Sequence, residues 1–356
     1  MACKAQTVLF KEYVEVGEVP PDNFQLRTID LPALKDGEVL LELQYLSVDP
    51  YMRGRMRNAA GYFVGPFVPG EALSGGGVVV VKESKAPGIE KGKFYSGMVP
   101  WTSPQIATKA QMEQMQPVDT DILKLAKLPL SGYAGVFGLT GMTAYASLTR
   151  IGKPKKGETV FVSGAAGAVG MIVGQMCKNV YGCKVVGSAG SEDKVEFLTK
   201  ELGFDAAWNY KTMPTLDALN KFCPEGIDMY YENVGGEQLE AALEKCRENA
   251  RIVCCGMISQ YNKKGDDRYG VKNLANVVFK KIKMEGFLLF QFLPEVVPEF
   301  FEHFPKWIAE GKIKDTEYVV KGGLANAGQA FCDMMAGKNK GKAVVKCVDK
   351  DPIVGN

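Results

Sequence analysis

Three glycines, each three residues from the next, stand in the stretch Thr159-Val-Phe-Val-Ser-Gly-Ala-Ala-Gly-Ala-Val-Gly170. A short apolar run that leads through such a turn into a helix is typical of a site for a dinucleotide pyrophosphate. Gly167 would let the backbone approach the phosphates, and Gly170 would let the helix pack closely on the strand. Free N–H groups and a partial positive charge at the helix N-terminus favour the anion. The usual first glycine is Ala165 here, so the surroundings must support this interpretation.

The elements around this turn alternate between strand and helix from about residue 128 onward. Strands are predicted from 159, over 184–188, 206–210, 226–232 and 251–255, and the segments between them have helical patterns. This alternation predicts an α/β fold with a doubly wound parallel sheet, which binds ligands in the loops after its strands.

The first 125 or so residues predict a different architecture. Strand-like segments recur over 6–10, 24–29 and 38–45, a glycine-rich loop leads into a buried strand at 75–81, and helical patterning is slight. A compact β-barrel-like module is therefore expected. Helices over 299–310 and 327–335 and strands over 317–320 and 342–348 follow near the end of the chain, where a strand that returns to the first module would fit.

Composition excludes several classes of function. The net charge is +2 and no apolar run has the length of a membrane span, so neither a nucleic-acid nor a membrane partner is expected. The N-terminus lacks the apolar core of a signal peptide. Nine cysteines form no C-x-x-C pair, which favours reduced thiols in a cytoplasmic protein. The only histidine, His303, lies off the apolar stripe of its helix and is expected at the surface.

The end of the second strand of the alternating region indicates which dinucleotide is bound. An acidic residue there would hold the 2′-OH of NAD, but this strand ends at Gly190 without one. Lys194 follows within one helical turn and Tyr210 ends the third strand, which favours the 2′-phosphate of NADP. Glu192 and Asp193 complicate this reading, although acids are ordinary in the first turn of a helix. The alternatives are a solvated Lys194, and flavin or S-adenosylmethionine in the glycine turn.

Several further motifs carry a resemblance to a known family. They are Ser47-Val-Asp-Pro-Tyr-Met-Arg53, Gly138-Leu-Thr-Gly-Met-Thr-Ala-Tyr145, Gly164–Gly170, Glu232-Asn-Val-Gly-Gly236 and Cys255-Gly-Met-Ile-Ser-Gln-Tyr-Asn262. From about residue 6 to 348 the chain resembles the zinc-independent branch of the medium-chain dehydrogenase/reductase superfamily, and within it the alkenal/enone double-bond reductases. The resemblance implies a GroES-like β-barrel domain over 1–128, a Rossmann NADP-binding domain over 129–312, and a C-terminal segment over 313–356 that returns to the first domain.

The superfamily's zinc enzymes provide an internal test. They place a cysteine where Ser47 stands and a Gly-His-Glu where Pro69-Gly70-Glu71 stands, and this chain has neither ligand. With one histidine in total, a His/Cys catalytic zinc is not expected. Because alcohol oxidation of the zinc type needs a Lewis acid at the oxygen, reduction of an activated C=C bond fits better.

The resemblance also implies roles for individual residues. Tyr261 is expected to stabilise or protonate the enolate after hydride reaches the β-carbon of an enal or enone, and Tyr51 to contact the substrate. The alternative for Tyr51 is a packing aromatic, and for Asn339 a simple turn role. Residues expected to bind NADP(H) are Ala166, Gly167, Ala168, Val169, Gly190, Lys194, Tyr210, Asn233, Cys255, Ile258, Phe287, Leu288, Leu289 and Asn339.

Two other functions stay open at this point. One is a quinone oxidoreductase of the same superfamily, and the other is a structural protein that binds NADP without turnover. A homodimer is expected from the family alone. The charged loop over 263–268 departs from the family's Pro- and Gly-rich pattern, so the physiological substrate is not predicted.

Overall fold

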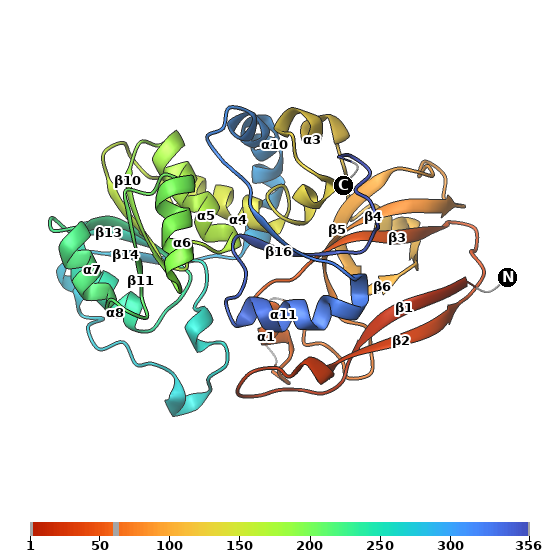
Figure 1. Cartoon of the computed structure of the whole chain (residues 1–356), viewed down its shortest axis with the longest axis horizontal. Coiled ribbons are helices and arrows are strands. Elements are labelled where there is room, and N and C mark those ends of the chain that lie inside the picture. Colours follow the sequence, from red (N-terminus) through yellow and green to blue (C-terminus); the bar gives the residue numbers. More distant parts are fainter. Residues whose placement is uncertain (1–2, 60–63, 355–356) are drawn as a thin grey trace. The chain divides into compact units, whose positions relative to one another are not determined.

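The computed structural model describes residues 3–59 and 64–354 (Figure 1). They form two compact units. One combines the residues up to Leu139 with those from Glu317 onward, and the other runs from Thr140 to Thr316. The domain boundaries expected from sequence stay predictions.

The second unit is built on a six-stranded parallel sheet with the order β11-β10-β9-β12-β13-β14. Its strands are β9 (Thr159–Val162), β10 (Lys184–Ala189), β11 (Ala206–Asn209), β12 (Ile227–Glu232), β13 (Cys246–Cys254) and β14 (Lys283–Gly286). The order reverses between β9 and β12, which is where doubly wound sheets bind ligands. The predicted parallel, Rossmann-like sheet is therefore confirmed.

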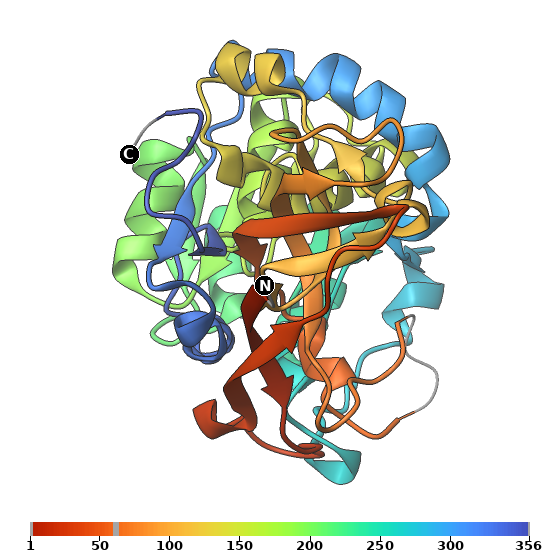
Figure 2. The same ribbon diagram turned by 90° about the vertical axis from the view of Figure 1, so that its right-hand side faces the viewer.

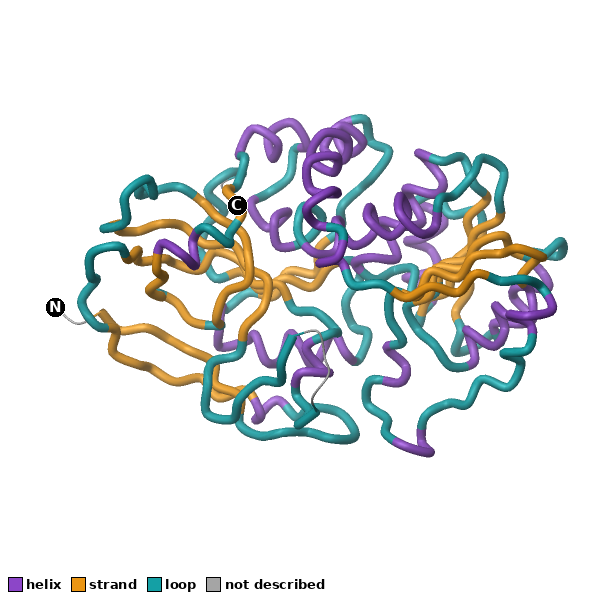
Figure 3. The backbone as a smooth tube through the Cα atoms, turned by 180° about the vertical axis from the view of Figure 1, so that it is seen from behind, coloured by secondary structure: helices purple, strands orange, loops and turns teal. Residues whose placement is uncertain are grey.

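Helices lie on both sides of this sheet, which forms a single layer in Figure 3. They are α4 (Leu139–Ser147), α5 (Ala168–Gln175), α6 (Glu192–Glu196), α7 (Thr215–Phe222), α8 (Glu237–Lys245), α9 (Asn276–Phe279) and α10 (Leu293–Ala309). Because both faces are covered, the inner strands are near-continuous apolar runs. In the core, Phe161 stacks on Tyr230 at a centroid distance of 4.7 Å and on Trp208 at 5.0 Å.

The first unit contains a seven-stranded mixed sheet and a three-stranded sheet. The larger has the order β15-β16-β3-β4-β5-β8, with β7 also paired to β3, and the smaller has the order β2-β1-β6. The bounds are β1 (Cys3–Phe10), β2 (Phe24–Leu31), β3 (Glu38–Ser47), β4 (Ser74–Ser84), β5 (Phe94–Pro100), β6 (Thr102–Ser103), β7 (Gln105–Thr108), β8 (Gln116–Pro117), β15 (Glu317–Val320) and β16 (Lys342–Lys346). The antiparallel pair β1 and β2 can be followed in red in Figure 2.

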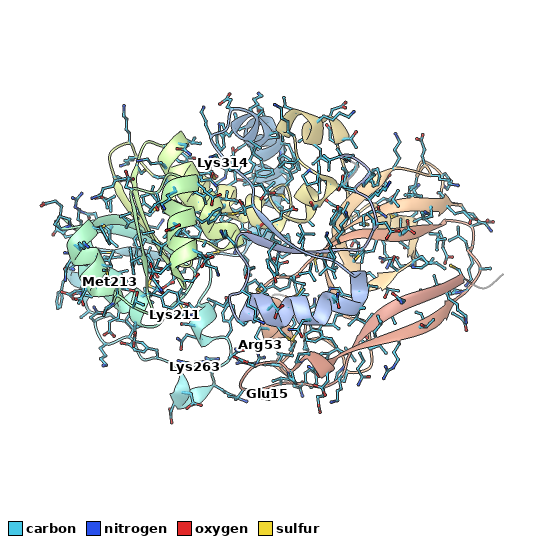
Figure 4. The ribbon with its side chains drawn as sticks, in the orientation of Figure 1. Glu15, Arg53, Lys211, Met213, Lys263 and Lys314 are labelled. Atoms are coloured by element: carbon cyan, nitrogen blue, oxygen red, sulfur yellow. The ribbon has the colours of Figure 1, made fainter. Side chains whose placement is uncertain are left out.

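Short helices complete the first unit. They are α1 (Met52–Arg55), α2 (Lys109–Met112), α3 (Thr120–Ala126) and α11 (Ala327–Met335). Arg53 of α1, labelled in Figure 4, is fully buried and its guanidinium donates to the carbonyls of Val14 and Gly17. Burial lowers the pKa of Arg53 to about 10. This guanidinium therefore fixes the loop after β1 against α1.

The last strand of the chain lies inside the sheet of the first unit. β16 pairs with β15 on one side and with β3 on the other, where Val344 is the register partner of Ser47. A mixed sheet separate from the parallel one agrees with the predicted second architecture.

Among the described residues, no helix is both long and apolar enough to cross a membrane.

Candidate functional site

The carboxyl ends of four neighbouring strands meet at one edge of the parallel sheet. Val162 of β9 is the register partner of Tyr231 in β12, Glu232 of that strand pairs with Cys254 of β13, and Cys254 pairs with Gly286 of β14. The loops that follow these strands therefore start from the same edge, as ligand-binding loops do in such sheets. Most of the cofactor residues predicted from sequence lie in these loops.

Two positions of the glycine turn after β9 accommodate only glycine. Gly164 has φ +57°, which side chains other than glycine rarely adopt. A Cβ on Gly170 would lie 2.5 Å from the carbonyl oxygen of Gly164, so helix α5 packs directly on the turn. Gly167 is the N-cap of this helix, and Ala166, Ala168 and Val169 surround it. The first N–H groups of the helix therefore start at the turn, ready for an anion.

Asn233 joins this turn to the loop after β12. Its side-chain amide donates to the carbonyl of Ser163 at 2.7 Å, and its backbone N–H donates to the hydroxyl oxygen of Ser163 at 2.9 Å. The Cβ position of Gly164 lies 3.6 Å from the Cβ of Asn233. Two of the predicted cofactor-binding segments are thus in direct contact.

A buried carboxylate lies beneath both loops. The Glu232 Oε1 atom accepts from the backbone N–H groups of Val234 and Gly235 at 2.6 and 2.8 Å, from the Tyr230 hydroxyl at 2.8 Å, and from the Ser163 hydroxyl at 3.2 Å. Its Oε2 atom is buried without a hydrogen-bond partner among the described residues. Burial raises the pKa of Glu232, although the four donors oppose this shift.

Glu232 also holds the loop after β13. The carbonyl of Glu232 accepts from the N–H groups of Cys255 and Gly256, and Asn233 accepts in the same way from Ile258. Burial raises the pKa of Cys255 to about 11, so the thiol stays neutral at physiological pH. The structure therefore brings together the glycine turn, Asn233, Cys255 and Ile258, and the loop that carries Tyr261 is fixed to them.

A second group of predicted residues lies at the end of β10. A Cβ on Gly190 would be 3.0 Å from the hydroxyl oxygen of Tyr210, so these two residues are neighbours. Glu192 accepts from the side-chain amide of Asn209 at 3.0 Å, and Asp193 accepts from the hydroxyl of Ser191 at 2.5 Å. Both acids of this first helical turn therefore accept hydrogen bonds from neighbouring side chains. Lys194 lies on the same short helix, α6.

Phe287, Leu288 and Leu289 directly follow β14 at the same edge of the sheet. Leu289 is buried and Leu288 is 42% exposed. The ring centroid of Phe287 lies 6.4 Å from that of Phe292. These apolar side chains continue the edge formed by the loops after β12 and β13.

Two predicted site residues belong to the first unit. Tyr51 precedes helix α1, and its hydroxyl contacts the sulfur of Met98 at 3.9 Å. The side-chain amide of Asn339 donates to the carbonyl of Gly341 at 2.7 Å, which closes the turn before β16. Tyr51 also packs against the core of this unit, so both residues have structural contacts in addition to their proposed roles.

The residues around Ser47 do not fit a zinc ion. The Ser47 hydroxyl donates to Asp49 at 2.5 Å, and the Lys342 ammonium donates to the other oxygen of the same carboxylate at 2.9 Å. A cation already neutralises this carboxylate, and a hydroxyl stands where a thiolate ligand would be needed. No group of three or more His, Cys, Asp or Glu side chains among the described residues is placed to hold a metal ion.

Sequence reasoning missed the roles of Glu232 and Lys342. Glu232 ends strand β12 and Lys342 begins strand β16, and both are almost fully buried. A charged residue at the end of a buried strand is the signal that could have identified them, because such a charge needs specific partners. The sequence pattern of the glycine turn gave no indication of what lies beneath it.

Comparison with known proteins adds independent findings. A family model described as the N-terminal domain of oxidoreductase matches residues 6–115, and one described as zinc-binding dehydrogenase matches residues 168–306. The chain is 42% identical over 342 residues to a 2-alkenal reductase (NADP(+)-dependent) of Nicotiana tabacum, with 95% of this chain and 96% of that protein covered.

A mammalian relative and a solved structure are similarly close. Prostaglandin reductase 1 of Mus musculus is 41% identical over 344 residues, with 96% of this chain and 99% of that protein covered. The crystal structure of CurA in complex with NADPH from Vibrio vulnificus is 37% identical and has a TM-score of 0.88, with 97% of this chain and 99% of that chain covered.

Proposed function

This chain belongs to the zinc-independent medium-chain dehydrogenases/reductases, among the relatives of 2-alkenal reductase and prostaglandin reductase, and we propose that it is an NADPH-dependent reductase. Its substrates are α,β-unsaturated aldehydes and ketones, and it reduces their C=C bond. The observation that carries this proposal is the loop cluster at the carboxyl edge of the parallel sheet. There the glycine turn is in contact with Asn233, which is bound to the loop that carries Tyr261.

The residues at this edge suit a dinucleotide. Gly164 gives the turn a positive φ, Gly170 lets helix α5 pack directly on the turn, and the N-terminus of α5 opens from it. We assign the pyrophosphate to Ala166, Gly167, Ala168 and Val169, and the nicotinamide side to Asn233, Cys255, Ile258, Phe287, Leu288 and Leu289. We assign Asn339 a polar contact to the cofactor.

The adenosine end is assigned to the residues after β10. The missing side chain of Gly190 lets the Tyr210 hydroxyl approach the backbone closely, and no acid ends the strand. The carboxyl group of Glu192 accepts a hydrogen bond from Asn209 and that of Asp193 accepts one from Ser191, so both acids have partners within the protein. Lys194 supplies a positive charge for the 2′-phosphate, which favours NADPH over NADH.

Bound NADPH supplies the hydride, which goes to the β-carbon of the substrate. Negative charge then builds on the carbonyl oxygen, and this chain's part is to stabilise it. Tyr261 donates a hydrogen bond or a proton to that oxygen, as a neutral phenol can at physiological pH. Tyr51 contacts the substrate and orients it. A metal has no place in this scheme because the residues around Ser47 do not fit one.

The chain also forms a homodimer in this proposal. β14 is the edge strand of the parallel sheet, and Val278 and Phe279 just before it are 75% and 74% exposed. An unpaired strand edge beside exposed apolar side chains is a suitable surface for a second copy.

We place the protein in the cytoplasm, since all nine cysteines are free thiols, as is usual in a reducing compartment.

One assay tests the activity. NADPH consumption is followed with matched panels of enals, enones and quinones, and the saturated product is identified for each consumed enal. We expect turnover of enals and enones, with the C=C bond reduced and the carbonyl retained. Preference for quinones would assign the chain to the quinone oxidoreductase alternative. NADPH binding without turnover of any panel member would support the non-catalytic alternative.

A further inference from the structure

An ammonium group is enclosed in the first unit. The Lys342 side chain is 2% exposed and that of Asp49 is 7% exposed, and they form an ion pair with 2.9 Å between Nζ and Oδ1. The ammonium also donates to the carbonyl of Val48 at 2.8 Å. The second carboxylate oxygen of Asp49 accepts from the hydroxyl of Ser47. Both charges are therefore satisfied by specific partners.

The pair joins two segments that are 293 residues apart in the chain. Asp49 leaves strand β3 and is followed by Pro50 and Tyr51, and its carbonyl accepts from the N–H of Met52. Lys342 begins strand β16, directly after the turn that Asn339 closes. The ion pair thus joins the segment that carries Tyr51, the proposed substrate contact, to the segment that carries Asn339, the proposed cofactor contact.

Stability alone is a weak reason for this pair. Taking two charges out of water costs free energy that their attraction repays only in part, and apolar residues of similar volume are often as stabilising. Unlike an apolar contact, an ion pair with two further hydrogen bonds fixes the orientation of the groups that it joins. Its partners here, Val48 and Asp49, lie within three residues of Tyr51.

We propose that Lys342 is a positioning residue, whose ion pair with Asp49 holds Tyr51 and the Asn339 turn in one fixed arrangement. The inference rests on the proposed function, because Tyr51 and Asn339 matter only if substrate and NADPH contact them. Loss of the pair should loosen both contacts together. The expected effect is weaker binding of enal and NADPH, with little change in the chemical step.

The test uses the double variant Lys342→Met with Asp49→Asn. It removes both charges, and the asparagine retains an acceptor for Ser47, so no buried charge is left unpaired. We expect a folded protein in which KM for an enal and Kd for NADPH each rise about tenfold, as for the loss of a charged hydrogen bond, while kcat stays within about twofold. Unchanged KM and Kd in the folded double variant would overturn the proposal.

The test includes a control variant and a second variant of the ion pair. The matched control is Lys82→Met with Glu42→Gln, an exposed ion pair that also involves β3, and it should leave both constants unchanged. If Lys342→Met with Asp49→Asn does not fold, Lys342→Gln with Asp49→Asn, which also leaves no buried charge unpaired and keeps a polar group at both positions, should raise both constants about threefold, and unchanged values in that variant overturn the proposal.

Kd for NADPH is measured by the fluorescence of the bound dinucleotide, without substrate. A wild-type protein that reduces no enal would contradict the proposed function, but the Kd arm would still test the role of Lys342.

Discussion

The phenolic oxygen of Tyr261 accepts a hydrogen bond from the backbone N–H of Met257 at 3.3 Å. A Cβ on Gly256 would lie 2.8 Å from the same oxygen, so the ring folds back over its own loop. Because a phenol both accepts and donates, accepting from Met257 uses none of its donor capacity. The loop therefore orients the hydroxyl through a hydrogen bond that does not use its hydrogen.

Tyr261→Phe should lower kcat for an enal about a hundredfold, because one donor to the developing oxyanion is lost. Kd for NADPH should not change. Stopped-flow hydride transfer and dinucleotide fluorescence measure the two quantities separately. Tyr181→Phe, at the end of the helix after the glycine turn, is the matched control. Wild-type turnover in the Tyr261 variant would contradict the role of this residue as proton or hydrogen-bond donor.

Lys194→Ala should weaken NADPH binding between about tenfold and a hundredfold, since a charge-assisted contact to the 2′-phosphate is removed. Binding of NADH, which lacks that phosphate, should hardly change. Titration of each dinucleotide measures the ratio. Lys200→Ala is the control, because Lys200 is exposed and paired with Glu196. Equal losses for NADH and NADPH would show that Lys194 does not recognise the phosphate.

Glu232 should make stability depend on pH. Burial raises the pKa of this carboxyl in the folded state, so the folded protein holds the proton more tightly than the unfolded chain does. The free energy of unfolding therefore falls as pH rises from the ordinary carboxyl pKa, near about 4.3, through the raised folded value. Glu232→Gln removes this contribution.

Urea unfolding at several pH values, from about 4 to 8, measures this effect. The wild type should lose stability relative to Glu232→Gln as pH rises. Glu225→Gln, at an exposed position, serves as the control for removal of a charge. A stability difference that is independent of pH would mean that the Glu232 carboxyl titrates alike in both states.

Phe279→Asp should separate the proposed homodimer into monomers. The side chain is 74% exposed in the single chain and lies beside the edge strand β14, so a charge there would be buried without a partner in the dimer. Light scattering gives the mass directly. Leu125→Asp, at an exposed position on α3, should leave the mass unchanged. A wild type with the mass of one chain would rule out the dimer.

Treatment with a metal chelator should leave activity unchanged. The prediction follows from the hydroxyl of Ser47 and its bond to a carboxylate that Lys342 already neutralises. A zinc-dependent alcohol dehydrogenase treated in parallel shows that the chelator works. Loss of activity that added zinc restores would refute the assignment to the zinc-independent branch.

Much of the second unit could be predicted from sequence because its strands are buried on both faces. The predicted segments 184–188, 206–210 and 226–232 overlap β10, β11 and β12 almost residue for residue. β14 was not predicted, because its residues are polar or half-exposed and it has a neighbour on one side only. Helix α10 was predicted to begin at 299, after Pro298, but it begins at Leu293 and includes that proline.

The site could be predicted only where chemistry follows a local pattern. The glycine turn has such a pattern, and Gly170 packs against it as the spacing predicts. The Glu232 carboxyl accepts from Tyr230, Val234 and Gly235, which are its neighbours in the sequence, but also from Ser163, which is 69 residues away. The partners of Lys342 lie near the other end of the chain. No local spacing encodes these long-range contacts, since the fold alone brings the partners together.

The place of β16 in the sheet has a consequence for synthesis on the ribosome. The second unit is one continuous stretch, Thr140–Thr316, so it can fold as soon as it has emerged. The first unit consists of two stretches, and Tyr45–Ser47 at the end of β3 lacks its partner strand until Lys342–Lys346 is translated. Part of the first unit is thus completed only after the whole second unit has been translated, and until then the newly made chain presents an unpaired strand end to chaperones or to other nascent chains.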